Sequence, residues 1–265
     1  MRRPPARPAT TRRDELSNPP PPAAGRQDGT GSRDVLILHT SDLHLGADSV
    51  LTDDATGNLP VLRQVLSTAR EHQADLVILA GDTFDHNRQG ARLVEEVSAA
   101  LADFSLPIVI LPGNHDPLTP DSVYRRSEFG NAGNVHVLGL TADTGDFPEL
   151  DLEVWGRPHV DYLDMMPLPG PPARRTRWQL AVAHGHYVED DPGSAVLLGS
   201  WLIRQQDLTT SGADYVALGH WNRAVPVGDQ QVPAYYSGSP GYAGTLNAVR
   251  LQSDGRVVVD QIPFG

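Results

Sequence analysis

The chain of 265 residues contains no cysteine, and none of its basic residues is lysine. Without cysteine the protein has no disulfides, zinc–thiolate sites, iron–sulfur clusters or thiol nucleophiles. Its apolar runs fall well short of the roughly 20 residues that cross a bilayer. We therefore expect a cytoplasmic protein that does not enter a membrane. The length suits one domain with a sizeable hydrophobic core.

Positive charge is scarce outside the first 33 residues. That segment carries a net charge of +4, from seven arginines against three acids, whereas residues 34–265 carry −16. Affinity for DNA normally comes from many contacts between basic side chains and phosphates. Residues 34–265, with their net negative charge, are therefore expected to bind polyanions poorly in general. The charge weakens the case for a nucleic-acid substrate without excluding one.

The first 33 residues are rich in proline and arginine, include a run of four prolines at 19–22, and show no apolar periodicity. Such a composition cannot bury enough apolar surface to fold. We predict a disordered tail over residues 1–33, followed by one folded domain over residues 34–265.

Apolar runs in the first half of the chain alternate with segments of helical spacing. Strands are expected at 35–39, 75–80 and 107–112, with helices near 59–69 and 93–104. This rhythm predicts a parallel sheet. After residue 130 strands come more densely, with one helix near 199–211 and a hairpin around Asp254-Gly255. Two facing sheets covered by helices fit this series.

Polar residues that can bind a metal follow five of the predicted strands. They are Asp42 and His44, Asp82, Asn114 to Asp116, and two histidines that end later predicted strands, His184 in WQLAVAH and His220 in DYVALGH. Ligands bind at the carboxyl ends of strands in open α/β sheets, so we expect these residues to converge. Asp, His and Asn without thiolate suit Mn, Fe or Zn. Two such ions about 3.5–4 Å apart, sharing a bridging carboxylate, can clamp the attacking and leaving oxygens of a displacement.

The motifs HTSDLHLG, LAGDTFD, LPGNHD, AHGH and LGHWN resemble, in this order, those of the calcineurin-like metallophosphoesterases. Together with the late YSGSP (236–240), they are most similar to the SbcD-type DNA-repair exonucleases. The resemblance runs from residue 35 to about 243. It implies an α/β fold, a four-layer α-β-β-α sandwich with two facing mixed sheets, and makes residues 34–265 the catalytic domain. It also implies two divalent metal ions, manganese first, with iron or zinc as alternatives.

The resemblance implies seven metal ligands, which are Asp42, His44, Asp82, Asn114, His184, His220 and Asn222. Asp42 and His44 would hold the first ion and Asp82 would bridge both. Asn114 and the two histidines would complete the second. The last position departs from the family pattern G-H-x-H, because Asn222 stands where the second histidine is expected. The first site is then either weaker or differently populated, or a neighbour such as His186 completes it.

The resemblance also implies catalytic and substrate-binding groups. His115 would protonate the leaving alkoxide or position the phosphate. Asp85, or else Asp116, would orient His115 through a hydrogen bond. His186 and Arg223 are expected to contact substrate, the latter through phosphate.

Other residues near the motifs receive structural predictions. His39, at a strand end, is expected to be packed or hydrogen-bonded rather than a ligand. His72, His136 and His159 have no motif around them and are expected to be structural or solvated. Trp221 is expected either to stack on a base or to wall the pocket.

These residues predict a metal-dependent phosphoesterase acting on phosphodiesters, of a nuclease-like kind, with DNA or a nucleotide as candidate substrate. A phosphomonoesterase or cyclic-nucleotide phosphodiesterase is the first alternative, and a non-catalytic binding protein with a degenerate site is the second. SbcD-type proteins continue into a capping domain and a segment that binds an SMC-like ATPase. Only about 25 residues follow YSGSP, so we expect that partner-binding region to be absent.

Overall fold

The computed structural model describes residues 33–47, 58–126, 129, 131–189 and 200–265. The chain divides into two compact units, 1–32 and 33–265, and all the described residues belong to the second. Apart from Arg33, the predicted tail lies outside the described residues. Within the described part, no helix combines the length and apolar character needed to cross a bilayer.

The first sheet has six strands in the order β14-β13-β1-β2-β3-β4. Its strands are β1 (Val35–Thr40), β2 (Leu76–Ala80), β3 (Ile108–Leu111), β4 (Val135–Val137), β13 (Thr245–Leu251) and β14 (Val257–Pro263). The strands from β1 to β4 run parallel, as the βαβαβ pattern predicts. β13 and β14 add antiparallel pairs at one edge and form the hairpin expected around Asp254-Gly255.

The second sheet also has six strands, in the order β11-β12-β10-β7-β6-β5. Its strands are β5 (Thr144–Phe147), β6 (Leu152–Gly156), β7 (Trp178–His184), β10 (Tyr215–Gly219), β11 (Val225–Val227) and β12 (Ala234–Tyr236). The central strands β6, β7, β10 and β12 are parallel, and the two edge strands are antiparallel to their neighbours. Both sheets are therefore mixed.

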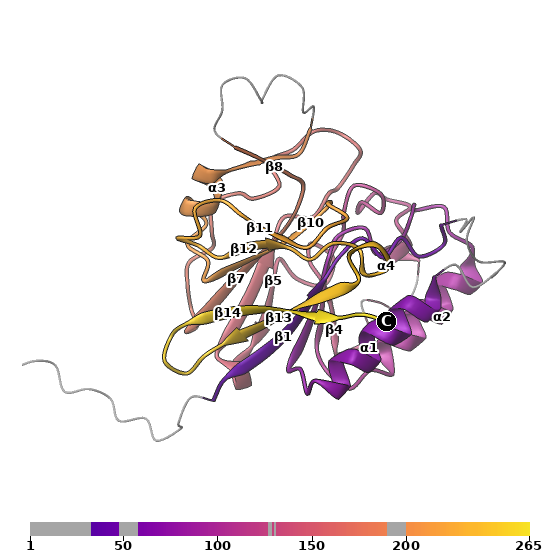
Figure 1. Ribbon diagram of the computed structural model, residues 1–265. Helices are drawn as coiled ribbons and strands as arrows, with labels where there is room; N and C mark the ends of the chain where they lie inside the picture. The colour runs from indigo at the N-terminus through magenta and orange to yellow at the C-terminus, as the bar shows by residue number, and fades with distance from the viewer. Residues whose placement is uncertain (1–32, 48–57, 127–128, 130, 190–199) are drawn as a thin grey trace, which may run out of the picture. The chain divides into compact units, whose positions relative to one another are not determined.

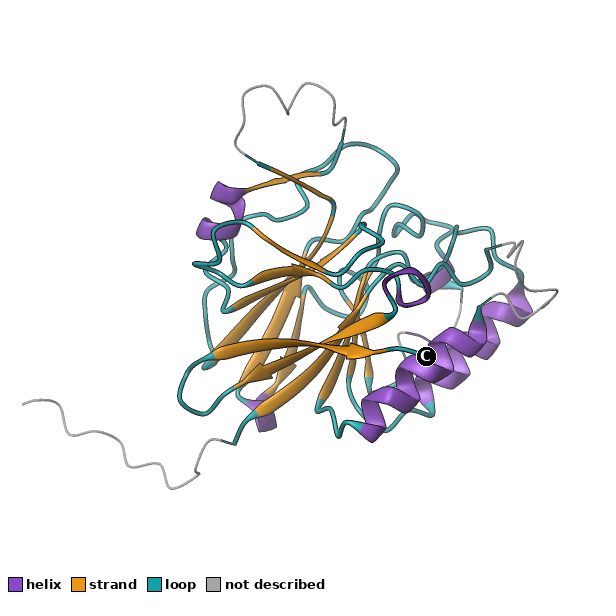
Figure 2. Cartoon of the chain, viewed as in Figure 1, coloured by secondary structure: helices purple, strands orange, loops and turns teal. Residues whose placement is uncertain are grey.

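The two sheets pack face to face, as Figures 1 and 2 show. One buried cluster joins side chains of both, including Ile37 and Ile78 from the first sheet and Val182 and Tyr215 from the second. Four strands of this core, β1, β2, β7 and β10, are buried along their whole length, which explains why the sequence shows continuous apolar runs there rather than alternation.

Two helices, α1 (Leu59–Glu71) and α2 (Ala91–Ala102), cover the outer face of the first sheet (Figure 1). Their buried residues fall three and four positions apart, as in Leu62, Val65, Leu66 and Ala69 of α1, which places one apolar stripe on the sheet. Pro60 in the first turn of α1 lacks an N–H that would have no helical partner there. Both helices were predicted from this spacing.

The outer face of the second sheet carries a thinner layer. It consists of α3 (Gln205–Thr210) and a two-stranded parallel ladder of β8 (His186–Val188) and β9 (Leu202–Arg204). Ile203 and Leu208 pack from this layer onto the sheet. The helix expected near 199–211 is thus shorter than predicted, because residues 202–204 pair with β8 instead. The short helix α4 (Pro240–Ala243) follows β12.

His39 is packed between the sheets, as predicted. It is fully buried, and its Nδ1 lies 2.9 Å from the hydroxyl of Tyr215. Burial lowers the pKa of His39 to about 3. The folded protein therefore holds this imidazole neutral, while the unfolded chain takes up its proton near 6.5.

The free energy of unfolding should consequently fall as the pH drops from 6.5 towards 3. The contribution of His39 is fully present above 6.5 and is lost on the acid side at up to about 1.4 kcal/mol per pH unit. His39→Gln should flatten this dependence by about one proton, measured by urea unfolding at several pH values. The same substitution at the exposed His72 is the matched control. An unchanged slope in His39→Gln would contradict the role of this residue.

Candidate metal centre

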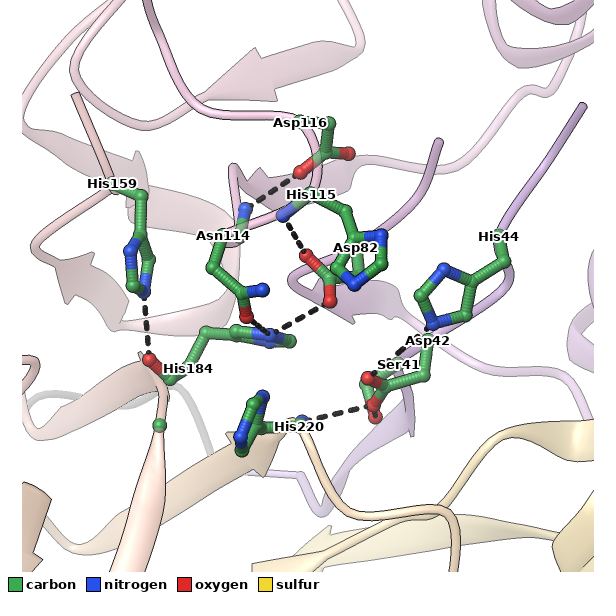
Figure 3. Close-up of polar contacts among 12 residues, drawn as sticks. Ser41, Asp42, His44, Asp82, Asn114, His115, Asp116, His159, His184 and His220 are labelled. Atoms are coloured by element: carbon green, nitrogen blue, oxygen red, sulfur yellow. Dashed lines mark hydrogen bonds and ion pairs between the residues drawn. The ribbon is translucent and has the colours of Figure 1, made fainter. Parts of the chain in front are cut away.

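Six of the seven predicted ligands, all but Asn222, meet at one edge formed by the carboxyl ends of both sheets. In the register, Ala80 at the end of β2 pairs with Leu111 at the end of β3, and Gly219 of β10 pairs with His184 of β7. The same edge of the two sheets therefore holds the loops that follow β1, β2, β3 and β10, together with the last residue of β7. Figure 3 shows the side chains directed towards a common space.

Four of these residues adopt backbone angles in the left-handed region. The φ angles are 55° for Asp42, 45° for His44, 50° for Asp82 and 106° for His220. Non-glycine residues rarely occupy this region, and Asp and His are among the side chains that do. Such conformations cluster at functional sites because they redirect a side chain at the end of a strand.

Among the residues that the structure describes, three groups of ligand atoms lie close enough to hold an ion. Asp42, His44 and Asp82 form one group, and Asp82, His184 and His220 form another, each with ligand atoms within 4.8 Å of one another. Asp82 belongs to both groups, which is the property required of a bridging carboxylate. The third group joins His44, Asp85 and His115.

The surroundings of His184 fit a cation. Its Nδ1 lies 2.9 Å from the carbonyl oxygen of Ala80 and therefore carries the proton that it donates. Its Nε2 lies 3.1 Å from Asp82 Oδ2 and 3.0 Å from Asn114 Oδ1 (Figure 3). Three groups that can each offer a lone pair thus converge, so the arrangement requires a positive charge among them, either a proton on Nε2 or a metal ion. A carbonyl-bonded imidazole with its second nitrogen facing oxygen ligands is a usual metal-binding arrangement.

The pKa values of His184 and Asp82 likewise indicate that a positive charge is stabilised between these two side chains. Burial would lower the pKa of His184, but the charge and hydrogen bond of Asp82 outweigh burial and raise this pKa to about 9. Burial would raise the pKa of Asp82, and His184 outweighs it, so that this pKa is lowered. In His220, burial and then the charge of His184 lower the pKa to about 4, which keeps the imidazole neutral and able to bind a metal.

Asp42 is held by its neighbours in a fixed orientation. It is nearly inaccessible, and its Oδ2 accepts hydrogen bonds from the hydroxyl of Ser41 at 2.5 Å and from the backbone N–H of His220 at 3.0 Å. Ser41 in turn lies 3.0 Å from Ser237 Oγ in the YSGSP segment. Burial, and then the negative charge of Asp82, raise the pKa of Asp42 despite the opposing effect of His184. A second positive charge at this end would relieve that repulsion.

Glycines of the motifs allow the close approach of these groups. A side chain on Gly113 would overlap the carboxylate of Asp82, and one on Gly81, where φ is +94°, would overlap the ring of His184. The small residues in PGN and AGD are therefore required by packing inside the site.

His115 stands beside the two ligand groups rather than inside them. Its backbone N–H donates to Asp82 Oδ1 at 2.9 Å, and its side chain is 44% exposed. Its Nδ1 lies 2.8 Å from the backbone carbonyl oxygen of Asp85 and donates to it. This leaves Nε2 as the nitrogen available to a substrate.

Asp85 and Asp116 differ from what their motif positions suggest. The carboxylate of Asp85 lies closer to His44 Nδ1, at 3.2 Å, than to His115 Nδ1, at 3.8 Å, so Asp85 orients His115 through its backbone. Asp116 is fully buried and accepts hydrogen bonds from the backbone N–H groups of Gly113 and Phe84 and from the hydroxyl of Tyr124.

Asp116 therefore holds the loops after β2 and β3 together. Burial, and then the charge of Asp82, raise the pKa of Asp116 to about 6.

An open cleft of ≈ 1050 Å³ begins at His220 and runs along the loop that follows β10. His186, Asn222 and Arg223 line it. Asn222 is exposed, and within the described part of the chain no hydrogen bond links it to Asp42 or His44. The structure thus places these three residues together at the cleft.

His159 supports the site, although no motif surrounds it in the sequence. It is fully buried, as expected of a structural histidine, and its Nε2 lies 2.9 Å from the backbone carbonyl oxygen of His184. Its ring makes edge-to-face contacts with His184 and Trp201, at interplanar angles of 83° and 78°. The only sequence signal for this role was its place after the strand β6.

Comparison with known families identifies the class of this site. A family model described as Calcineurin-like phosphoesterase matches residues 35–223. The chain belongs to that family. The match confirms the predicted family and, at this level, the class of reaction, which is hydrolysis of phosphoester bonds.

Relatives of this calcineurin-like phosphoesterase include the SbcD subunit of the nuclease SbcCD of Bacillus subtilis (strain 168). It is 26% identical over 81% of this chain and 66% of that protein. The DNA double-strand break repair protein Mre11 of Aeropyrum pernix is 28% identical over 82% of this chain and 54% of that protein. The chain thus spans about two thirds or less of the length of these relatives.

The solved structure of TT1561 of Thermus thermophilus superposes with a TM-score of 0.57 over 86% of this chain and 98% of that one. At 13% identity this likeness shows the fold alone. It confirms the predicted class, a mixed α/β fold with two facing mixed sheets.

Proposed function

We propose that this chain is a nuclease-like phosphodiesterase with a two-metal centre. The observation that carries the proposal is the position of Asp82, which belongs to both groups of metal-binding side chains and accepts a hydrogen bond from the backbone of His115. Asp42 and His44 would hold the first ion. Asn114, His184 and His220 would hold the second.

The chain's own residues would bind and orient the substrate around this centre. When bound, the two ions supply an activated water and neutralise charge on the phosphoryl oxygens. His115 Nε2 would donate a proton to the leaving oxygen, with the ring fixed through Nδ1 by the carbonyl of Asp85. His186 and Arg223 would contact the substrate along the cleft. Asp116 would keep the two loops in register without touching substrate.

The size of the cleft favours a diester over a monoester. It opens directly from His220 and has room for a second substituent on the phosphorus. The names of the two relatives, a nuclease subunit and a DNA double-strand break repair protein, extend the proposal to DNA as substrate and to a partner subunit. We propose manganese as the native metal, because the donor set of carboxylate, imidazole and amide oxygen suits it.

The test is a metal-supplemented screen of the full-length protein. Bis-p-nitrophenyl phosphate, p-nitrophenyl phosphate, cyclic nucleotides, and single- and double-stranded DNA would be offered with Mn, Fe and Zn in turn. The proposal predicts manganese-dependent hydrolysis of the diester and of DNA. Hydrolysis of p-nitrophenyl phosphate alone would contradict this proposal and would indicate a phosphomonoesterase. Failure of the purified protein to bind any of the three metals would contradict the assignment as a metal-dependent enzyme.

Asn222→His should tighten the binding of the first ion. Imidazole is a stronger neutral ligand for these metals than an amide oxygen, and Asn222 is exposed at the cleft edge, so the longer side chain meets no packed core. We expect an increase in metal affinity of about tenfold or more, by analogy with the losses seen when supporting groups are removed. Titration calorimetry with Mn²⁺ would measure it, with Asn222→Gln as control. Equal affinity in both variants would mean that another residue already fills the position.

A further inference from the structure

Trp221 is fixed on both faces and at its edge. One face stacks on Tyr236, with ring centroids 4.3 Å apart and planes at 8°. The guanidinium carbon of Arg223 lies 5.1 Å from the centre of the Trp221 ring. A parallel ring at 4.3 Å leaves no space for a guanidinium on the same side, so Arg223 covers the opposite face. With both faces occupied, Trp221 walls the cleft and does not stack on a base.

The edge of Trp221 determines the chemistry of His186. The indole Nε1–H of Trp221 donates to His186 Nδ1 at 3.0 Å. An indole nitrogen is a donor only, so Nδ1 must present its lone pair, and the neutral imidazole carries its proton on Nε2. His186 is therefore a hydrogen-bond donor through Nε2. This tautomer argues against His186 as a stand-in metal ligand.

The two residues expected to contact substrate, His186 and Arg223, are thus both held by Trp221. His186 lies at the start of β8 and Arg223 in the loop after β10, and both line the cleft that opens from His220. His186 offers a neutral N–H and Arg223 a planar cation suited to phosphate oxygens. The cleft is large enough for more than a single phosphoryl group.

We propose that Trp221 is the positioning residue of this cleft, holding His186 and Arg223 to bind a second phosphate of an oligonucleotide, next to the phosphate that is cut. The inference rests on the proposed phosphodiesterase function and names its substrate class. Because these groups hold a part of the substrate that does not react, they act on KM more than on kcat.

Trp221→Phe tests the edge of the ring, since phenylalanine keeps an aromatic ring between Tyr236 and Arg223 but has no N–H. KM for a short DNA oligonucleotide should rise about 2- to 10-fold, the equivalent of one hydrogen bond, with little change in kcat. Bis-p-nitrophenyl phosphate has no second phosphate, so its KM should rise less. In a His186→Ala background, Trp221→Phe should add little, because the bond it removes is already gone. Trp178→Phe, at the opposite end of β7 from His184, is the matched control.

A spectroscopic readout separates this role from general packing. Nitrogen NMR of the full-length protein, loaded with diamagnetic zinc, should show His186 protonated at Nε2 in the wild type and a mixture of tautomers in Trp221→Phe. A wild-type imidazole protonated at Nδ1, or equal KM changes for both substrates, would overturn the proposal while leaving the phosphodiesterase assignment intact. Absence of hydrolysis of either substrate by the wild type would overturn the proposed function instead, and the tautomer result would still decide the geometry at Trp221.

Discussion

His115→Ala is expected to lower kcat about 100- to 10,000-fold on an alkyl phosphodiester such as DNA, while the metal content stays at the wild-type level. The side chain is 44% exposed and lies outside the two ligand groups around Asp82, so its removal leaves no core cavity. The bond that His115 contributes to Asp82 comes from its backbone N–H, which alanine keeps. The loss should therefore appear in turnover alone.

The leaving group distinguishes the two roles that the sequence left open for His115. A general acid matters most when the departing oxygen is a strong base, so the loss should shrink on bis-p-nitrophenyl phosphate, whose phenolate leaves unaided. If His115 only positions the phosphate, the two substrates should lose turnover equally. The exposed His72→Ala serves as control, and full activity of His115→Ala on DNA would refute both roles.

Gly113→Ala is expected to weaken metal binding by about 10- to 100-fold. The added methyl group would overlap the carboxylate and backbone nitrogen of Asp82. Asp82 has no room to retreat, because its Oδ1 accepts from the backbone of His115 and its Oδ2 faces His184. Gly113 does not need a left-handed backbone, so the cost arises from this overlap, at about 1–3 kcal/mol of stability.

Gly90→Ala is the matched control for this experiment. Gly90 precedes α2, and a side chain there would meet no atom within 4 Å. Calorimetric titration with Mn²⁺ would compare the two variants, with circular dichroism to confirm that each is folded. Wild-type affinity in Gly113→Ala would contradict this expectation and would mean that the loop after β3 can shift without moving Asp82.

The sequence predicted those parts of the site whose signals are local. Ligands such as Asp42 and Asp82 follow directly after apolar strands, and parallel strands bring their carboxyl ends to one edge. The periodic apolar residues of α1 and α2 likewise predicted both helices. These features depend on spacing within a few residues, which is visible in a single sequence.

Contacts between distant segments could not be predicted in the same way. His159 meets His184 across 25 positions, and Trp221 meets His186 across 35. The pairing of residues 202–204 with β8 likewise shortened the expected helix, because tertiary pairing overrides local preference. Asp116 is a related case, since its motif position matches a catalytic residue and only burial among its partners shows that it holds loops together.

The left-handed backbone at Asp42, His44, Asp82 and His220 has a consequence for how this protein can change. Each such residue costs stability, of order 1–3 kcal/mol in unfavourable cases, which glycine at the same position would avoid. Selection for a sturdier fold would therefore push these four positions towards glycine, and each step would delete a ligand. The metal ligands at these positions thus lower the free energy of unfolding, and substitutions intended to stabilise the protein should be made away from this edge of the sheets.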